Sequence, residues 1–458
     1  MLTNYTNAPD VNSTLIIEGA LEGWQTTAPC DRRIVHRVNQ GNNFGARLRS
    51  VIYSESLTHA ENARRAYAEN FPWISHPTET EMKIAVLKEE LPGEARVALM
   101  PDSAKKLLAL RASVIIESGA GLAAARLDAD YAEAGAQVSA DRNAILDETD
   151  VLVAVNRPSD EVFAKLRKGA VVLGFLRPLD EPQALRPALA HGLTTFAMEL
   201  VPRITRAQSM DALSSMATVA GYKAVVLAAA SIPRMFPLLM TAAGTVPPAR
   251  VLVLGAGVAG LQAIATARRL GAVVEAYDVR AAAGEQVRSL GATFLDVDLG
   301  GLKTEDAGGY AVELSEEALK RGRDLIAEHA KTADVVITTA QVPGRRAPLL
   351  MDEAAVDGMK RGAIVIDLAG STGGNVEPGK PDEVVERNGV VIMSPTNLPA
   401  TVPVHASQLY SRNVTAFLSL LIKDGDLNID MNDDVVGPSC VTHAGQWANS
   451  RVAAAIKG

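Results

Sequence analysis

The chain has 458 residues, of which 48% are hydrophobic and 21% charged, and its net charge is −8. This length suits two or three globular domains, and the negative charge argues against nucleic acid as a general partner. Cys30 and Cys440 provide no disulfide framework, and the seven scattered histidines form no metal-binding motif, so we expect no metal site.

Residues 1–81 differ from the rest of the sequence. They contain Trp24, Trp73 and three of the seven histidines, with little hydrophobic periodicity. Two interpretations stay open: a poorly ordered extension without a function of its own, or a natural translation start at Met82. No secretory signal and no membrane span is predicted, because the most apolar region, 224–246, is interrupted by charge and proline. A cytoplasmic location is therefore expected.

From Met82 onward, short β-type runs alternate with helical stretches. This alternation predicts parallel sheets and a doubly wound α/β fold. A long Ala-rich helix is expected at about 209–230, with Ser209 as its N-cap, and another at 411–422. The expected strands are 82–88, 113–121, 150–155, 170–176, 194–200, 251–254, 273–277, 334–340, 363–369 and 389–394.

The order of these elements predicts two Rossmann-like domains with a cleft between them. The first domain is discontinuous and combines residues 82–212 with 402–458, because the C-terminal helical pattern is expected to pack back on it. The second domain comprises residues 213–401.

A glycine-rich turn between the strand 251–254 and a following helix indicates dinucleotide binding. Gly255, Gly257 and Gly260 form GxGxxG, and Asp278 follows at the end of the next strand, 23 residues after Gly255. Asp278 is expected to accept hydrogen bonds from the adenosine ribose, which favours NAD(H) over NADP(H), while nearby Arg280 weakens that preference. The candidate cofactor-binding residues here are Gly255, Gly257, Val258, Ala259, Gly260, Asp278, Val279 and Arg280.

The stretch "PRITRAQSMDALSS", from Pro202 to Ser215, is rich in hydrogen-bonding groups but lacks His, Lys, Cys and Tyr. Gln208, Asp211 and Ser214 are spaced by three and share a face if the segment is helical. The residues alone leave two alternatives: a polar loop that caps the long helix, or a site that needs geometry and hydrogen bonds but no proton acceptor.

These motifs, with "AGYKAV", "TTAQVPGRRAP" and "GPSCVT", resemble the NAD(H)-binding domain I of proton-translocating NAD(P)+ transhydrogenase. The resemblance covers about 82–445 and implies an oxidoreductase of the Si/Re-specific type. It places Arg203, Gln208 and Asp211 beside the nicotinamide and gives Ser214 a role in loop conformation. It also implies that Tyr310 closes over the nucleotide in a mobile loop, and that Gln341 and Val342 lie near the cofactor.

The resemblance also implies partners and a location. Domain I forms a homodimer and passes hydride to NADP+ held on a beta subunit, while membrane subunits couple this transfer to proton movement. The chain is then expected to lie on the cytoplasmic face of the inner membrane, held there by its partners and without a membrane span of its own.

Two alternatives belong to other functional classes. An alanine dehydrogenase-like enzyme would use Arg96 for the substrate carboxylate, but Asn156 and Arg177 stand where that family carries Lys and His for proton handling. Asn does not titrate and Arg stays protonated, so neither serves as a general base. A non-catalytic NAD-sensing module is the third possibility, and the Rossmann motif alone is compatible with it.

Overall fold

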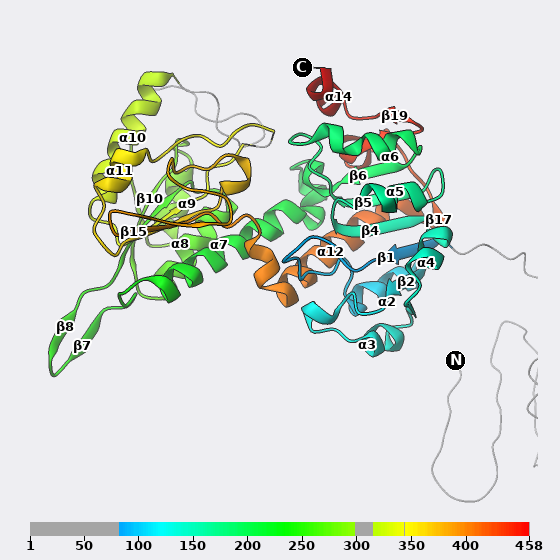
Figure 1. The fold of residues 1–458 in the computed structure, drawn as a ribbon, viewed down its shortest axis with the longest axis horizontal. Coiled ribbons are helices and arrows are strands. Elements are labelled where there is room, and N and C mark those ends of the chain that lie inside the picture. Colours follow the sequence, from blue (N-terminus) through cyan, green and yellow to red (C-terminus); the bar gives the residue numbers. More distant parts are fainter. Residues whose placement is uncertain (1–81, 298–314, 343, 458) are drawn as a thin grey trace, which may run out of the picture. The chain divides into compact units, whose positions relative to one another are not determined.

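The computed structural model describes residues 82–297, 315–342 and 344–457. All of them belong to one compact unit, Glu81–Gly458 (Figure 1). The predictions for residues 1–81 and for Tyr310 lie outside the described residues.

The first sheet holds eight strands in the order β19-β18-β6-β5-β4-β1-β2-β3. Strands β1 to β6 run parallel, and their order is that of a doubly wound Rossmann-type sheet. Near the C-terminus, β18 pairs antiparallel with β6 and extends the sheet edge. The bounds are Lys83–Val86 (β1), Ser113–Glu117 (β2), Gln137–Ser139 (β3), Val151–Asn156 (β4), Val171–Phe175 (β5), Thr194–Ala197 (β6), Cys440–His443 (β18) and Gln446–Trp447 (β19).

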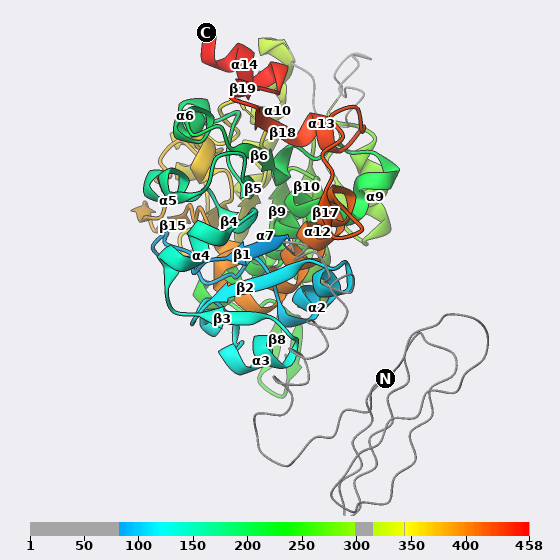
Figure 2. The same ribbon diagram turned by 90° about the vertical axis from the view of Figure 1, so that its right-hand side faces the viewer.

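Helices cover both faces of this sheet because its central strands are apolar on both sides. Leu152 and Val172 point to a face covered by α4 (Arg142–Glu148), α5 (Asp160–Lys165) and α6 (Arg186–Ala190), which lie together in Figure 2. Val86 and Val153 point to the opposite face, which packs against α2 (Pro101–Ala109), α3 (Asp128–Glu133) and α12 (Pro403–Leu421).

The second sheet holds seven strands in the order β11-β10-β9-β12-β13-β15-β14. It repeats the doubly wound order, with β14 as an antiparallel edge strand. The bounds are Arg250–Leu254 (β9), Val273–Tyr277 (β10), Thr293–Phe294 (β11), Val335–Thr338 (β12), Ile364–Asp367 (β13), Val384–Arg387 (β14) and Val390–Met393 (β15).

Two helical layers enclose the second sheet. One face buries Val251 and Val253 under α7 (Ala212–Ser231), α8 (Val258–Arg269) and α9 (Ala283–Ser289). The other face buries Leu252 and Val336 under α10 (Glu316–Ala330) and α11 (Glu353–Asp357). Two parallel, doubly wound sheets thus confirm the predicted α/β class, and antiparallel strands occur only at edges of the described sheets.

Short elements complete the described part of the chain. Strands β7 and β8 form an isolated antiparallel hairpin, as do β16 and β17. The bounds are Leu239–Thr241 (β7), Gly244–Val246 (β8), Ile422–Lys423 (β16), Asp426–Leu427 (β17), Val436–Ser439 (α13), Ser450–Lys457 (α14), Leu122–Ala124 (η1), Pro182–Leu185 (η2), Met198–Leu200 (η3), Thr205–Met210 (η4), Gly370–Thr372 (η5) and Leu398–Thr401 (η6).

Both long helices begin at residues other than those predicted. Helix α7 is capped by Asp211 and not by Ser209, because residues 205–210 form the 3₁₀ turn η4 and the Asp211 carboxylate accepts from the Ser214 N–H at 2.8 Å. Helix α12 begins at Pro403, well before residue 411, since proline is tolerated in a first helical turn.

Helix α7 is the one described helix that is long and apolar enough to cross a membrane by length and composition. A buried core helix meets the same criteria. Ala224, Val225 and Ala228 of α7 are fully buried in the core of the second sheet, together with residues of α8.

Helices α7 and α8 approach each other closely at Gly221. A Cβ atom at this position would lie 2.1 Å from the carbonyl oxygen of Ala259. We therefore expect Gly221→Val to lower the free energy of unfolding by about 3 kcal/mol, measured by urea denaturation. Ala230→Val, at an exposed position of the same helix, is the control and should cost only about 0.5 kcal/mol. Equal unfolding midpoints for the two variants would contradict this packing argument.

Candidate functional site

The predicted glycine turn lies at the carboxyl end of β9, at the point where the strand order of the second sheet reverses. Gly255 has a φ of +99°, which favours glycine, and a Cβ there would lie 2.6 Å from the Thr339 hydroxyl oxygen. A Cβ at Gly260 would lie 1.8 Å from the Gly255 carbonyl oxygen. Both glycines are therefore required by close packing of the turn.

Gly257 differs from its neighbours because a Cβ built there meets no atom within 4 Å. It is the N-cap of α8, and Val258 and Ala259 form the first turn of that helix. The free N–H groups of a helix N-terminus attract an anion. Open space above these donors therefore fits a dinucleotide pyrophosphate.

Asp278 follows β10 and is held by donors of its own chain. Its carboxylate accepts from the Ala256 N–H at 2.7 Å and from Arg280 through Nε and Nη2, each at 2.9 Å. Only 7% of the Asp278 side chain is exposed, and Val279 beside it is half-buried against the sheet core. Arg280 therefore offsets the negative charge that was expected to disfavour a 2′-phosphate.

The segment after β12 lies directly beside the glycine turn. The Thr339 hydroxyl donates to the Gly255 carbonyl oxygen at 3.0 Å. Two residues later, the exposed Gln341 donates from Nε2 to the Leu368 carbonyl oxygen at 2.6 Å, and Val342 is half-buried. The structure therefore brings this predicted segment to the carboxyl edge of the second sheet, where the glycine turn also lies.

The polar loop before α7 gathers three of the residues predicted for it. Gln208, Asp211 and Ser214 line one hollow of about 350 Å³ together with Ser215, Thr218 and Leu409. Asp211 holds the loop, since its Oδ1 accepts from the Ser214 N–H at 2.8 Å and its Oδ2 from the Ser214 hydroxyl at 2.6 Å. Capping and site formation are thus combined in one segment.

The two arginines of this loop are both exposed. Arg203 lies between η3 and η4, just before the hollow. Arg206 forms ion pairs with Asp433, at 2.8 Å, and with Asp434. The pairs of Arg206 tie the loop to the segment that precedes α13.

Helix α7 connects the hollow with the glycine turn. Asp211 caps its N-terminus, and Gly221 contacts Ala259 in the first turn of α8. Ten residues of helix span about 15 Å. One rigid element therefore fixes the spacing between the candidate pyrophosphate cradle and the polar hollow.

Two buried carboxyl groups near this loop were not predicted from the sequence. Burial raises the pKa of Glu199, in η3, to about 7, and one of its oxygens is buried without a hydrogen-bond partner. Burial also raises the pKa of Glu89 to about 6. The sequence signal was their place just after the apolar strands β6 and β1, but only packing reveals that they are buried.

The residues compared with alanine dehydrogenase belong to a buried polar network. Burial opposes ionisation of Glu94, but the hydrogen bond and charge of Arg96 lower its pKa to about 2. Asn156 donates from its amide to Glu89 at 3.1 Å and to Glu94 at 2.9 Å. Glu94 thus already occupies Arg96, the residue predicted to bind a substrate carboxylate in that alternative.

Arg177 lies at a second position compared with alanine dehydrogenase. Its backbone N–H donates to Glu199, while its half-exposed side chain pairs with Asp180 and Glu181. Neither Asn156 nor Arg177 supplies a group that accepts a proton near neutral pH.

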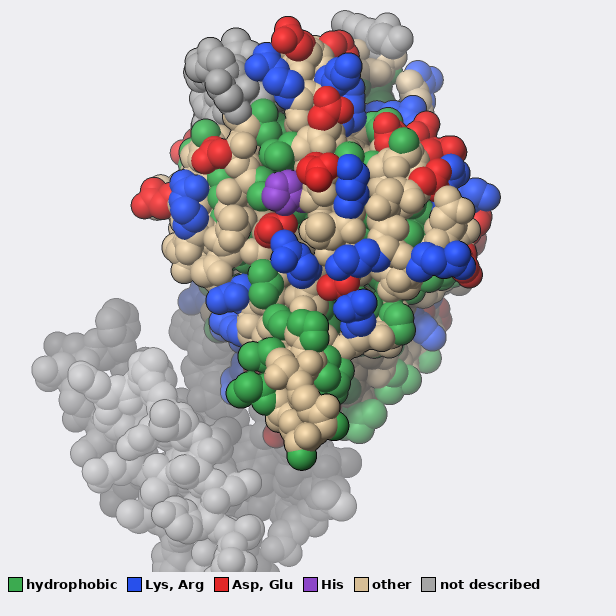
Figure 3. Space-filling model, turned by 90° about the vertical axis from the view of Figure 1, so that its left-hand side faces the viewer, with side chains coloured by type: hydrophobic (Ala, Val, Ile, Leu, Met, Phe, Trp, Pro, Cys, Tyr) green, Lys and Arg blue, Asp and Glu red, His purple; other side chains and the backbone are tan. Residues whose placement is uncertain are grey.

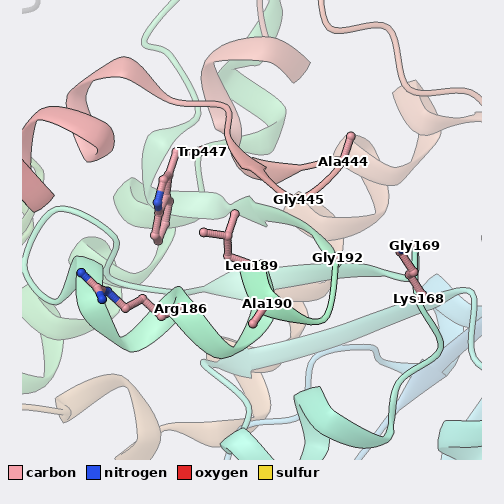
Figure 4. Close-up of a pocket in the computed structure, with 9 residues that line it drawn as sticks. All are labelled: Lys168, Gly169, Arg186, Leu189, Ala190, Gly192, Ala444, Gly445 and Trp447. Atoms are coloured by element: carbon pink, nitrogen blue, oxygen red, sulfur yellow. The ribbon is translucent and has the colours of Figure 1, made fainter.

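A larger hollow of about 950 Å³ lies elsewhere on the first sheet, between α6 and the β18–β19 turn (Figure 4). Lys168, Arg186 and Trp447 line it, and none of the predicted site residues does. Among the described residues, no cluster of three or more His, Cys, Asp or Glu side chains is arranged to hold a metal ion.

Comparison with known proteins identifies the family. Residues 85–220 match the model described as alanine dehydrogenase/PNT, N-terminal domain, and residues 224–450 match the corresponding C-terminal domain. An NAD(P) transhydrogenase alpha subunit of Rhodospirillum rubrum is 47% identical over 373 residues, which cover 80% of this chain and 97% of that protein.

Solved structures give the same assignment of fold. A transhydrogenase structure from Sinorhizobium meliloti has a TM-score of 0.73 and 45% identity, covering 80% of this chain and 99% of the other. An L-alanine dehydrogenase structure has a TM-score of 0.70 at 26% identity, covering 82% of this chain and 99% of the other. The alanine dehydrogenase of Halomonas elongata is 30% identical, covering 82% of this chain and 97% of that enzyme.

Similarity of fold therefore extends to both enzyme groups, while sequence identity is higher with the transhydrogenases. The chain belongs to the alanine dehydrogenase/transhydrogenase family and, within it, to the NAD(P) transhydrogenase alpha subunits.

Proposed function

We propose that this chain binds NAD(H) and positions NADH for direct hydride transfer to NADP+ held on a partner beta subunit. The observation that carries the proposal is the path of α7, which joins the hollow lined by Gln208 and Asp211 to the glycine turn at Gly257. In this arrangement the turn holds the pyrophosphate, and the hollow receives the nicotinamide end.

The proposed chemistry requires positioning more than proton transfer. Bound NADH supplies the hydride, and direct transfer requires the reacting carbons to approach within roughly 3–3.5 Å. Gln208 both donates and accepts hydrogen bonds, Arg203 carries a rigid fork of donors, and Asp211 is fixed by Ser214. Tyr310 and its loop remain a proposed cover that excludes water.

We also propose that proton movement takes place in membrane subunits that this chain contacts on the cytoplasmic face of the inner membrane. The relatives named subunit alpha support a complex of several subunits. A mixture of the chain, NADH and an NADP+ analogue, assayed with and without the beta subunit, tests the transfer. Oxidation of alanine by the chain alone would favour the dehydrogenase alternative, and tight NADH binding without any transfer would favour a sensing module.

The role of Gln208 is tested by shortening its side chain. We expect Gln208→Asn to slow hydride transfer at least about tenfold, because a shift of roughly 1 Å misplaces the reacting groups. NADH affinity should stay within about twofold, measured by fluorescence titration. Gln183→Asn, at an exposed residue of η2, is the matched control. A large loss of affinity with a normal transfer rate would show that Gln208 acts in binding instead.

The paired charges at Asp278 and Arg280 make opposite predictions for nucleotide selectivity. Asp278→Ala should weaken NADH binding and lower the ratio of NADH to NADPH affinity, because the ribose loses an acceptor. Arg280→Gln should raise that ratio, because Asp278 loses the guanidinium that offsets its charge. Titration of both variants with both nucleotides measures the ratio. A ratio that moves in the same direction in both variants would contradict this assignment.

The homodimer is proposed from the resemblance and from an apolar hairpin. Residues 235–249, which contain β7 and β8, include no charged side chain. Met240 is 78% exposed, and Met235 and Leu238 are more than half exposed. Hydrophobic side chains gather over this hairpin at the lower end of Figure 3. A contiguous exposed apolar surface of this kind is typical of a protein–protein interface, and a second copy of the chain is the proposed occupant.

A charge placed on the hairpin tests this interface. We expect Met240→Asp to shift the protein from dimer to monomer in size-exclusion chromatography with light scattering, because a buried unpaired carboxylate opposes association. Val384→Asp, at another exposed apolar residue on the edge strand β14, is the control and should leave the dimer intact. A dimer that persists in Met240→Asp would place the interface elsewhere.

A further inference from the structure

A side chain of α12 holds the backbone of the polar loop from below. Asn413 is 7% exposed, and its Nδ2 donates to the Ser209 carbonyl oxygen at 2.8 Å. Because a carbonyl oxygen only accepts, the orientation of the amide is fixed. Ser209 directly follows Gln208, so this bond fixes the backbone at the residue after the glutamine proposed to act in transfer.

The rest of the Asn413 amide is not accounted for by packing. Its Oδ1 is buried without a hydrogen-bond partner among the described residues. A buried, unpaired acceptor lowers stability, and an apolar side chain of similar volume would avoid that penalty. The donated bond to the loop is therefore the one contribution seen in the structure that requires an amide at this position.

Helix α12 is itself anchored and can serve as a fixed support. The backbone N–H groups of Val97 and Met100 donate to the hydroxyls of Ser407 and Ser411, at 3.0 and 2.9 Å. Both serines are fully buried. Just upstream of α12, Asn397 donates to Glu94 at 3.0 Å. These bonds fasten α12 to the loop that follows the first strand of the sheet.

One face of α12 forms part of the site itself. Leu409 lines the hollow that contains Gln208 and Asp211. It lies four residues before Asn413, so both side chains project from the same helical face. This face supplies an apolar wall through Leu409 and a backbone anchor through Asn413.

We infer that Asn413 is a positioning residue for hydride transfer, which acts by holding the Ser209 carbonyl and thereby the placement of Gln208 and Asp211. The inference rests on the proposed function, but it adds a residue from a distant part of the sequence that touches the loop and not the nucleotide.

The test compares Asn413→Leu with Ser419→Ala. Leucine has a similar volume, removes the donor and removes the unpaired acceptor, so the thermal unfolding midpoint should not fall. Hydride transfer should slow roughly 10- to 100-fold, with NADH affinity within about twofold, because the loop is misplaced. Ser419 bonds only within α12, to the Thr415 carbonyl, and its variant should behave as the wild type.

Amide hydrogen exchange of residues 205–212 provides a readout independent of activity. It should be faster in Asn413→Leu than in the wild type, while exchange in the first sheet is unchanged. A folded variant with wild-type transfer and unchanged loop exchange would overturn the inference. A wild-type protein that binds NADH but transfers no hydride with its partner would overturn the proposed function, and loop exchange would still decide the role of Asn413.

Discussion

The contact between α7 and α8 at Gly221 is the constraint on which the candidate site depends. The carbonyl oxygen of Ala259 occupies the space that a side chain would fill, so the two helices approach as closely as their backbones allow. This contact fixes α7 against the helix that begins at the glycine turn. The hollow at the opposite end of α7 is therefore held at a defined spacing from the candidate pyrophosphate cradle.

A second support acts on the hollow from the side of the first sheet. Helix α12 is packed in the core of that sheet and is bonded through Ser407 and Ser411 to the loop after β1. Asn413 passes this rigidity to Ser209. The polar loop is thus fixed at its carboxyl end by α7 and along its backbone by α12, which is the kind of preorganisation that a positioning mechanism requires.

The buried carboxyl groups distinguish this site from a general acid–base site. Glu94 is kept ionised by Arg96 and by two donated amides, so it serves to hold structure together. Glu89 and Glu199 have a raised pKa because they are buried, and Glu199 lies close to the polar loop in sequence. The residues that line the hollow itself bring hydrogen bonds and no such titrating carboxyl except Asp211, which caps α7.

The sequence by itself determined the α/β class, most strands and the glycine turn, because these depend on local hydrophobic patterns and on glycines at fixed spacing. It also marked the polar loop, although it placed the N-cap at Ser209 and not Asp211. Only the tertiary structure showed that Arg280 pairs with Asp278, that Glu199 is buried, and that Asn413 reaches Ser209. Such contacts depend on side-chain direction and on packing between segments up to 204 residues apart, which no local pattern records.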